Sequence, residues 1–536
     1  MVKITDNYIN NQAFADAGIS VPDYDDTKLS GKTRWVHFGG GNLFRAYHAA
    51  VADKLLSIGD LDAGVVVADT HSKAVIEDVY KPFNNKILRV ITKDDGNFDK
   101  SLLASVSEAL YLTPSETDNW KKMKEIFESP ELQLASFTIT EKGYGLWKSD
   151  GELTDVVKKD IADGPDSPVN NMAGLASLMF ARFKAGKYPM ALLSTDNFSQ
   201  NGDKLKKSVV TVAEGWAKNG LVDSEFVDYL KNDKLVSFPL SMIDRITPNP
   251  SETVAKKLAN EGFEDSQIIS TGNTDFAAFA NTEEVHYLVV EDSFPNGRPS
   301  FEKAGVIMTD RDTVNDADEM KVTTCLNPLH TALAVHGDLL GFESISEEVK
   351  DEDMLNLIKQ IGYVEGLPVV KDPKVIDPKD FIDQLLNKRL PNPYIPDKPQ
   401  RIASDTSQKL AIRYGVTISH YLDASDRKVS DLHFIPLVLA TWCRYLMAID
   451  DSGEEFTPSP DPLLTELQPK VSDIKLGEDV NVHEHLKDIL ANKAIFGHDL
   501  YEIGLADQVE SYFAKQISGK GAVRATLKAT LAEFSK

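Results

Sequence analysis

The sequence predicts an α/β protein with a parallel sheet in its first part and a mostly helical domain in its second part. Three observations support this fold class. Apolar runs alternate with helical stretches between residues 34 and 194, a glycine turn follows the first of these runs, and strand-like runs become rare after residue 300. Periodicity of this kind is the main sequence signal for secondary structure. We therefore expect two domains, residues 1–302 and residues 303–536.

The apolar runs of the first domain are the expected strands. They are nearly continuous rather than alternating, which is typical of strands that are covered on both faces. This favours a parallel sheet flanked by helices. The runs are 34–38 (RWVHF), 64–68 (GVVVA), 87–92 (ILRVIT), 134–140 (LASFTIT) and 189–194 (PMALLS).

The second domain is expected to be built from helices. The most apolar stretch, residues 434–449, is short for a membrane span and contains Arg444, so it predicts a buried helix. Proline-rich segments at 390–400 and 457–469 interrupt the helical patterns. Those patterns cover residues 320–341, 346–361, 407–422, 431–449 and 509–535.

Composition limits the classes of function. The chain has 536 residues, with 58 Lys and Arg against 83 Asp and Glu, and its formal net charge is −25. Such a charge repels nucleic acids and anionic membranes, so we expect neither as a partner, whereas a local basic pocket for a small anion is compatible with it. Two cysteines, Cys325 and Cys443, are too few for a disulfide framework, and no zinc-site spacing is present, so no metal is expected. The polar N-terminal stretch predicts a cytoplasmic protein.

A glycine turn directly follows the first expected strand and precedes a helical stretch. In this context, Gly39 and Gly41 let the backbone approach a pyrophosphate, which then lies at the start of the helix that follows Asn42. This predicts a Rossmann-type dinucleotide site. Asp69 ends the next strand, where a carboxylate binds the ribose hydroxyls of NAD and repels the 2′-phosphate of NADP. The GxGxxG pattern is incomplete at Phe44, so a glycine turn without a ligand is the alternative.

A second group of polar residues lies between positions 320 and 334. Asn327 and His330 are three residues apart and share one helical face. Oxidation of an alcohol needs a base for the hydroxyl proton, which a buried lysine such as Lys321 supplies, and an amide stabilises the developing oxyanion. Pro328 begins or bends the helix between these groups. The alternative is a structural helix with a solvent-facing lysine and a histidine in the core.

Several separated segments, taken together, resemble one known family. The chain is similar to the polyol-specific long-chain dehydrogenases, the group of mannitol 2-dehydrogenase and fructuronate reductase. That family shows GxGxxxR at the glycine turn, which Gly39, Gly41 and Arg45 satisfy. The matching segments are 37–50, 138–144, 192–203, 238–248, 289–306, 320–334, 388–393 and 401–410.

The resemblance implies an NAD-binding Rossmann domain, a helical domain, an active site in the cleft between them, and metal-independent hydride transfer. It implies that Lys321 is the general base, that Asn327 is the oxyanion donor, and that His330 orients substrate or lysine. In the family this lysine and asparagine are one residue closer than here, so either the helix start is bulged or the base is displaced.

Three further residues take their expected roles from the same resemblance. Asn197 and Asp244 correspond to polar residues of the substrate site, and Arg389 corresponds to a substrate-binding cation. The alternatives are that Asn197 and Asp244 cap turns, and that Arg389 pairs with Asp397.

The resemblance and the local charge together lead to a substrate class. Recognition of a sugar acid requires a fixed cation, and Arg389, Lys398 and Arg401 lie close together in an otherwise acidic sequence. The first hypothesis is therefore an NAD-dependent oxidoreductase that interconverts D-fructuronate and D-mannonate. The second is a mannitol 2-dehydrogenase or a tagaturonate reductase, and the third is a silent NAD(H)-binding sensor. We expect a monomer or a small homo-oligomer.

Overall fold

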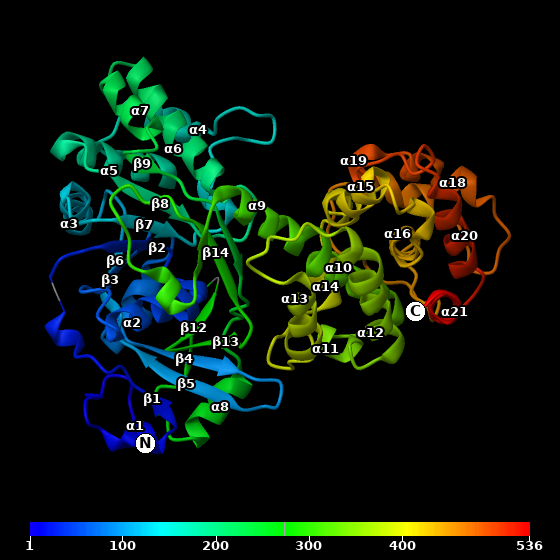
Figure 1. Ribbon diagram of the computed structural model, residues 1–536, viewed down its shortest axis with the longest axis horizontal. Coiled ribbons are helices and arrows are strands. Elements are labelled where there is room, and N and C mark those ends of the chain that lie inside the picture. Colours follow the sequence, from blue (N-terminus) through cyan, green and yellow to red (C-terminus); the bar gives the residue numbers. More distant parts are fainter. Residues whose placement is uncertain (30, 273, 536) are drawn as a thin grey trace. The chain divides into compact units, whose positions relative to one another are not determined.

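The structure is a computed structural model that describes residues 1–29, 31–272 and 274–535. The chain divides into two compact units, residues 1–315 and 316–536 (Figure 1). This division falls within helix α9 (Arg311–Met320). The boundary expected at 302/303 stays a prediction.

A six-stranded parallel sheet forms the centre of the first unit. Its order is β6-β3-β2-β7-β8-β9, and every neighbouring pair is parallel. The chain reverses its direction of travel across the sheet between β2 and β7, as in doubly wound dinucleotide-binding folds. The predicted α/β class is thus confirmed. The strands are β2 (Trp35–Phe38), β3 (Val65–Asp69), β6 (Val106–Tyr111), β7 (Leu134–Phe137), β8 (Met190–Ser194) and β9 (Val236–Ser237).

Helices cover both faces of this sheet (Figure 1). Val36 and Phe38 pack with side chains of α3, α5 and α6, whereas Trp35 packs with side chains of α2 on the opposite face. This explains why β2 and β3 are buried at every position and read as continuous apolar runs. The helices of this unit are α1 (Gln12–Asp16), α2 (Ala49–Ser57), α3 (Thr117–Glu128), α4 (Asp155–Asp163), α5 (Asn171–Gly186), α6 (Asn201–Lys218), α7 (Ser224–Lys231) and α8 (Glu252–Asn260).

One expected strand of the parallel sheet belongs to a different sheet. β4 (Ile87–Thr92) pairs antiparallel with β5 (Phe98–Leu103). A tight turn joins them, in which Gly96 has φ +83° and its N–H donates to Lys93 O at 3.1 Å. A strand followed by so short a turn pairs with its successor, so placing 87–92 in the parallel sheet was wrong. The third strand of that sheet is β6, which does not form an apolar run because it contains the polar residues Ser107 and Glu108.

Three smaller sheets complete the first unit. The first has the order β1-β5-β4-β13, the second β10-β14-β15 and the third β11-β12. Their remaining strands are β1 (Ile19–Ser20), β10 (Ser241–Asp244), β11 (Ile268–Ser270), β12 (Asp275–Ala277), β13 (Phe279–Glu283), β14 (Tyr287–Glu291) and β15 (Ile307–Thr309).

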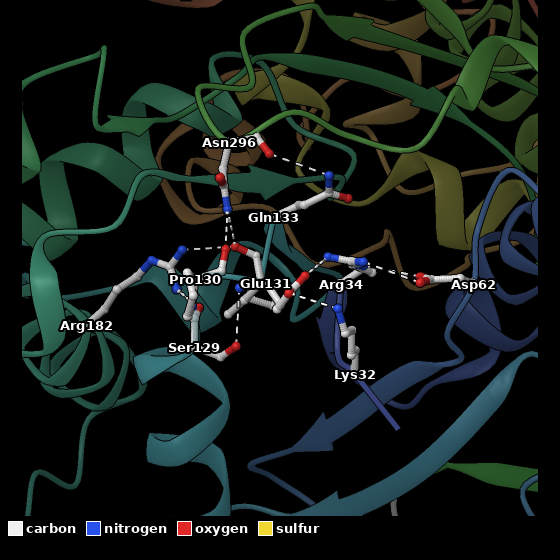
Figure 2. Close-up of polar contacts among 10 residues, drawn as sticks. Lys32, Arg34, Asp62, Ser129, Pro130, Glu131, Gln133, Arg182 and Asn296 are labelled. Carbon is white, nitrogen blue, oxygen red and sulfur yellow. Dashed lines mark hydrogen bonds and ion pairs between the residues drawn. The ribbon is translucent and has the colours of Figure 1, made fainter. Parts of the chain in front are cut away.

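A polar network fastens the amino ends of the central strands (Figure 2). Arg182 of α5 is fully buried, and its five N–H groups all donate to backbone carbonyls. Arg34, just before β2, bonds Glu131 and Asp62, and Glu131 also pairs with Lys32 at 3.0 Å. These contacts tie the starts of β2, β7 and β8 together. The carbonyls that Arg182 bonds, at 2.7–2.9 Å, belong to Phe127, Ser129, Leu132, Tyr188 and Pro189.

The second unit is helical, as expected, but several predicted helices are interrupted. The 346–361 pattern is divided between α11 (Ile345–Glu348) and α12 (Glu352–Lys359). The 320–341 pattern consists of the end of α9, a π-helix (Lys321–Cys325) and α10 (Asn327–Leu340). The 509–535 pattern is two helices, because Gly521 adopts φ +78° between α20 and α21. The other α-helices are α11 (Ile345–Glu348), α12 (Glu352–Lys359), α13 (Pro378–Gln384), α14 (Pro399–Ala403), α15 (Val416–Asp423), α16 (Phe434–Tyr445), α17 (Leu464–Leu467), α18 (Val482–Leu490), α19 (Lys493–Phe496), α20 (Ala506–Gln516) and α21 (Ala522–Phe534).

The most apolar segment forms α16, and all of its residues are buried. It contains Cys443, while Cys325 lies in the π-helix, and both thiols are free and buried. Among the described residues, no helix combines the length and the apolar character that a membrane span requires.

Candidate active site

The glycine turn after β2 has the geometry of a dinucleotide-binding turn. Gly39 has φ +105°, and a Cβ on it would lie 2.1 Å from the carbonyl oxygen of Thr138, so only glycine fits. A Cβ on Gly41 would meet nothing within 4 Å. The first glycine therefore allows the turn and the third leaves its backbone open to close approach by a ligand.

Asp69, the last residue of β3, connects this turn to the loop that follows it. The Asp69 Oδ2 atom accepts the N–H of Gly40 at 3.0 Å, and Oδ1 accepts those of His71 and Ser72 at 2.9 and 2.8 Å. A carboxylate accepts about four hydrogen bonds, so roughly one position remains for a ribose hydroxyl. The bonds also hold a negative charge beside the turn.

The helix after the turn begins at Asn42 and continues through a π-helix (Phe44–His48) into α2. Arg45 is buried, and its guanidinium donates to Asn42 Oδ1 at 3.2 Å and to the carbonyl of Ala277 at 2.5 Å. Burial lowers the pKa of Arg45 to about 10. In the structure Arg45 thus fastens the turn to β12, and its expected contact with a cofactor stays a prediction.

A cavity of about 500 Å³ opens at the carboxyl ends of β2, β3, β6 and β7. Its walls are mostly apolar and include Phe38, Leu112, Trp120 and Met172, with Thr70 directly after Asp69. Ligand pockets have this size and character. The apolar cavity, the open Gly41 backbone and the carboxylate of Asp69 together fit the adenosine half of a dinucleotide.

The loop after β8 carries Asn197, which is exposed, next to the buried Asp196. Asp196 accepts the N–H groups of Ile139 and Thr140, both at 2.9 Å, and the hydroxyl of Tyr144 at 2.6 Å. Burial raises the pKa of Asp196. The three hydrogen bonds that Asp196 accepts hold in place the loop that carries Asn197.

Asn201 joins this loop to β10, the strand that ends in Asp244. Its Nδ2 donates to the carbonyls of Asp196 and Ser241, both at 3.0 Å, and its Oδ1 accepts the N–H of Ser241 at 3.1 Å. The segments that carry Asn197 and Asp244 are therefore held side by side. Asp196 and Asn201 belong to the 192–203 segment, but sequence reasoning did not single them out, because their partners are distant in the chain.

In the second unit, Lys321 is the first residue of the π-helix. It is only 2% exposed, and its Nζ lies 3.4 Å from Asp318 Oδ1. Of the two explanations offered for the long Lys321–Asn327 spacing, the structure contains the bulged helix start. A π-turn holds one more residue than an α-turn and is frequent at functional sites.

Asn327 and His330 lie on the first turn of α10, and both are half-buried. Leu326 separates them from the π-helix with φ −126° and ψ −67°, which is not helical. Pro328 occupies a first-turn position, where its missing N–H costs nothing. The arrangement presents one amide and one imidazole from a single helical face, beyond a buried ammonium group.

Arg389 is the last residue of another π-helix (Leu385–Arg389) and is buried. Asp397, named above as an alternative partner for Arg389, makes an ion pair with Arg401 at 2.6 Å. The charge of Arg401 is therefore already offset by Asp397.

Comparison with known proteins places the chain in a family. The Mannitol dehydrogenase Rossmann domain matches residues 33–303, and the Mannitol dehydrogenase C-terminal domain matches residues 314–516. The chain belongs to the mannitol dehydrogenase family. The resemblance noted in the sequence is thus confirmed, and the protein is an oxidoreductase with a nicotinamide dinucleotide cofactor.

Individual relatives support the same assignment. The chain is 50% identical to a D-mannonate oxidoreductase of Thermotoga maritima, over 96% of both chains. It is 31% identical to a mannitol 2-dehydrogenase of Pyrenophora tritici-repentis, over 90% of this chain and 79% of that one. Among solved structures, the Pseudomonas fluorescens mannitol 2-dehydrogenase in a ternary complex with NAD and D-mannitol matches with a TM-score of 0.70 and 26% identity, over 96% of this chain and 97% of that one.

Proposed function

We propose that the protein is an NAD-dependent oxidoreductase that interconverts D-fructuronate and D-mannonate. The observation that carries this proposal is the 50% identity, over 96% of both chains, to a D-mannonate oxidoreductase. The more distant relatives include mannitol 2-dehydrogenases at 31% identity and below. A buried arginine, Arg389, in a protein of net charge −25 also favours an anionic substrate.

The proposed cofactor site consists of Gly39, Gly41, Asn42, Arg45 and Asp69. The backbone at Gly41 and the start of the helix at Asn42 receive the pyrophosphate. Arg45 supports this turn through its hydrogen bonds to Asn42 Oδ1 and to the carbonyl of Ala277. The charge of Asp69 lies where a 2′-phosphate would be placed, which favours NAD over NADP.

The proposed catalytic residues are Lys321, Asn327 and His330. When bound, the nicotinamide cofactor supplies a hydride to the carbonyl carbon of the substrate. Lys321 gives a proton to the carbonyl oxygen in the reductive direction and takes it back in the oxidative direction. The Asn327 amide donates to that oxygen as negative charge develops on it, and His330 orients the substrate or the lysine.

Three residues are proposed to bind the substrate. Asn197 and Asp244 bind its hydroxyl groups. Arg389 binds the carboxylate, because a guanidinium forms two parallel hydrogen bonds with such a group.

The experiment that tests the substrate is an NADH oxidation assay with D-fructuronate, D-tagaturonate and D-fructose in parallel. We expect turnover with fructuronate at the highest kcat/KM. Turnover of fructose alone would instead identify a mannitol 2-dehydrogenase. Binding of NADH without turnover of any of the three would identify a silent sensor.

The role of Lys321 is tested with Lys321→Met, using the exposed Lys350→Met as a matched control. Lys321→Met is expected to lower kcat by about 100-fold or more, because general acid–base catalysis contributes 10²–10⁴-fold. Its affinity for NADH should stay close to that of the wild type. Retained activity would reject the lysine as the base.

A further inference from the structure

A second segment of the helical unit runs along residues 319–331, the catalytic segment, which contains the proposed catalytic residues Lys321, Asn327 and His330. Residues 413–420, from the π-helix Ala411–Gly415 and α15, contact residues 319–331 in reverse order. Four of the contacts are hydrogen bonds or ion pairs made by polar side chains of residues 413–420. They are His420 Nε2 to Glu319 Oε1 at 3.3 Å, Thr417 Oγ1 to Thr323 O at 2.9 Å, Tyr414 Oη to Pro328 O at 2.6 Å, and Arg413 Nη1 to Thr331 Oγ1 at 2.5 Å.

One of these contacts replaces a helical hydrogen bond that the sequence forbids. In a π-helix each carbonyl accepts from the N–H five residues later, as the Lys321 carbonyl does from Leu326 at 3.1 Å. The corresponding donor for Thr323 would be residue 328, which is proline and has no N–H. The hydroxyl of Thr417, which is buried, donates to that carbonyl instead.

The contacts lie on both sides of the break at Leu326. Thr417 bonds the π-helix that begins with Lys321, whereas Tyr414 bonds Pro328 in α10, the helix that carries Asn327 and His330. Leu326 has non-helical dihedral angles, and among the described residues only its own backbone bonds, N–H to Lys321 O and carbonyl from His330 N–H, both at 3.1 Å, are seen to link the two helices across it. Two hydroxyls from one short segment bracket the break in addition.

The bracketing segment is itself held in place. A Cβ on Gly415, between Tyr414 and Thr417, would lie 2.4 Å from the carbonyl oxygen of Phe496. The segment therefore packs directly on the backbone at the end of α19, and this close contact leaves it little freedom to shift.

We propose that Thr417 and Tyr414 are positioning residues that set the placement of Lys321 relative to Asn327 and His330. The inference rests on the proposed function, because it concerns the catalytic roles given above. Neither hydroxyl is proposed to touch the substrate. Both hold the π-helix and α10 in place on either side of Leu326, so they set how Lys321 and Asn327 approach one carbonyl oxygen of the substrate.

The experiment compares Thr417→Val and Tyr414→Phe with two controls. Thr530→Val, in the same unit, removes a buried hydroxyl that donates to the carbonyl of Thr526 at 2.9 Å, and Tyr229→Phe, in the first unit, removes one that donates to the carbonyl of Tyr188 at 2.7 Å. Each control deletes a bond from a hydroxyl to a backbone carbonyl, away from residues 319–331. The readouts are kcat and KM with fructuronate, the Kd for NADH, and the thermal midpoint.

Thr417→Val and Tyr414→Phe should each lower kcat about 10- to 100-fold, since misplacement of catalytic groups by about 1 Å costs this much. KM and the Kd for NADH should change less than threefold. Thr417→Ser keeps the hydroxyl and should recover most of the lost kcat. The controls should lose comparable thermal stability but keep the wild-type kcat.

Two results would overturn the inference while leaving the proposed function intact. The first is a kcat within twofold of wild type in both Thr417→Val and Tyr414→Phe. The second is an equal loss of kcat in the controls, which would indicate a general stability effect. Absence of turnover in the wild type would overturn the proposed function, and the inference with it.

Discussion

At the amino end of the six-stranded sheet, Arg182 donates all five of its N–H groups to backbone carbonyls, which ties the starts of β7 and β8 together. Figure 2 shows the part of this network around Ser129 and Glu131. At the carboxyl end, a Cβ on Gly41 would meet nothing within 4 Å, and a cavity of about 500 Å³ opens next to Phe38 and Thr70. One end of the sheet satisfies its own polar groups, whereas the other keeps backbone free for a ligand. The bonded amino ends hold the strands in place, and the strands in turn position the glycine turn and the loops at their carboxyl ends.

The largest expected effect comes from the bonded amino end. Arg182→Met would leave five carbonyls without their donor, and at roughly 1 kcal/mol each we expect a loss of about 5 kcal/mol in the free energy of unfolding. Urea denaturation followed by tryptophan fluorescence measures it, because Trp35, Trp120, Trp147 and Trp216 lie in this unit. Lys184→Met, on an exposed position of the same helix, is the control. Equal free energies of unfolding for the two variants would show that Arg182 does not hold the amino ends of the strands together.

The next effect comes from the open end. Gly39→Ala places a Cβ against the Thr138 carbonyl and strains a φ of +105°, so we expect a loss of roughly 3 kcal/mol. NADH binding should also fall at least tenfold, as measured by fluorescence titration. Gly41→Ala fits sterically and should keep the stability while weakening NADH binding. If Gly41→Ala binds NADH normally, the turn does not receive the cofactor.

A smaller effect is expected for cofactor choice. Asp69→Asn removes the negative charge beside the glycine turn and turns one acceptor into a donor that faces backbone N–H groups. The preference for NADH over NADPH should fall about tenfold, because the 2′-phosphate is no longer repelled. Parallel kcat/KM measurements with the two cofactors test this. An unchanged ratio would place the ribose elsewhere.

Asp196 makes the open end sensitive to pH. Its folded pKa is raised by burial, so the unfolded chain releases this proton first as the pH increases. The contribution of Asp196 to stability is therefore largest below its ordinary pKa of about 4 and declines as the pH rises through the raised value. Denaturation series from pH 4 to pH 8 should show this decline in the wild type and a smaller one in Asp196→Asn. Parallel curves would contradict the assignment.

The smallest effect also belongs to the amino end. Arg34 pairs with Asp62 and Glu131, but all three are partly exposed, and solvent screens such pairs. Arg34→Gln should shift the thermal midpoint by no more than about 2 °C. A larger shift would show that this surface network, and not only Arg182, fastens the strands.

Sequence patterns located the elements that are buried on both faces. β2, β3, β7 and β8 lie within the expected runs or one residue beyond them, because burial on two sides produces continuous apolar sequence. The pairing of β4 depended on a tight turn rather than on hydrophobicity, so the sequence run alone assigned it to the wrong sheet. A helical pattern likewise does not reveal a break such as the one at Leu326.

The candidate site divides in a similar way. Motifs located Gly39, Asp69 and Lys321, whose chemistry is visible in residue type and context. Thr417 and Tyr414 could not be found in this way, since their partners lie 94 and 86 residues away and are plain backbone carbonyls. Such roles arise only when the chain is folded.

Both cysteines of the chain lie in the helical unit, in the π-helix and in α16, and both are buried. Burial raises the pKa of each thiol, so neither forms the reactive thiolate while the unit stays closed. Alkylation by a thiol reagent therefore reports local opening of the helical unit and not of the first unit. The rate of alkylation measures how often this opening occurs. Cys325, four residues after Lys321, would record each opening of the segment that carries the proposed base.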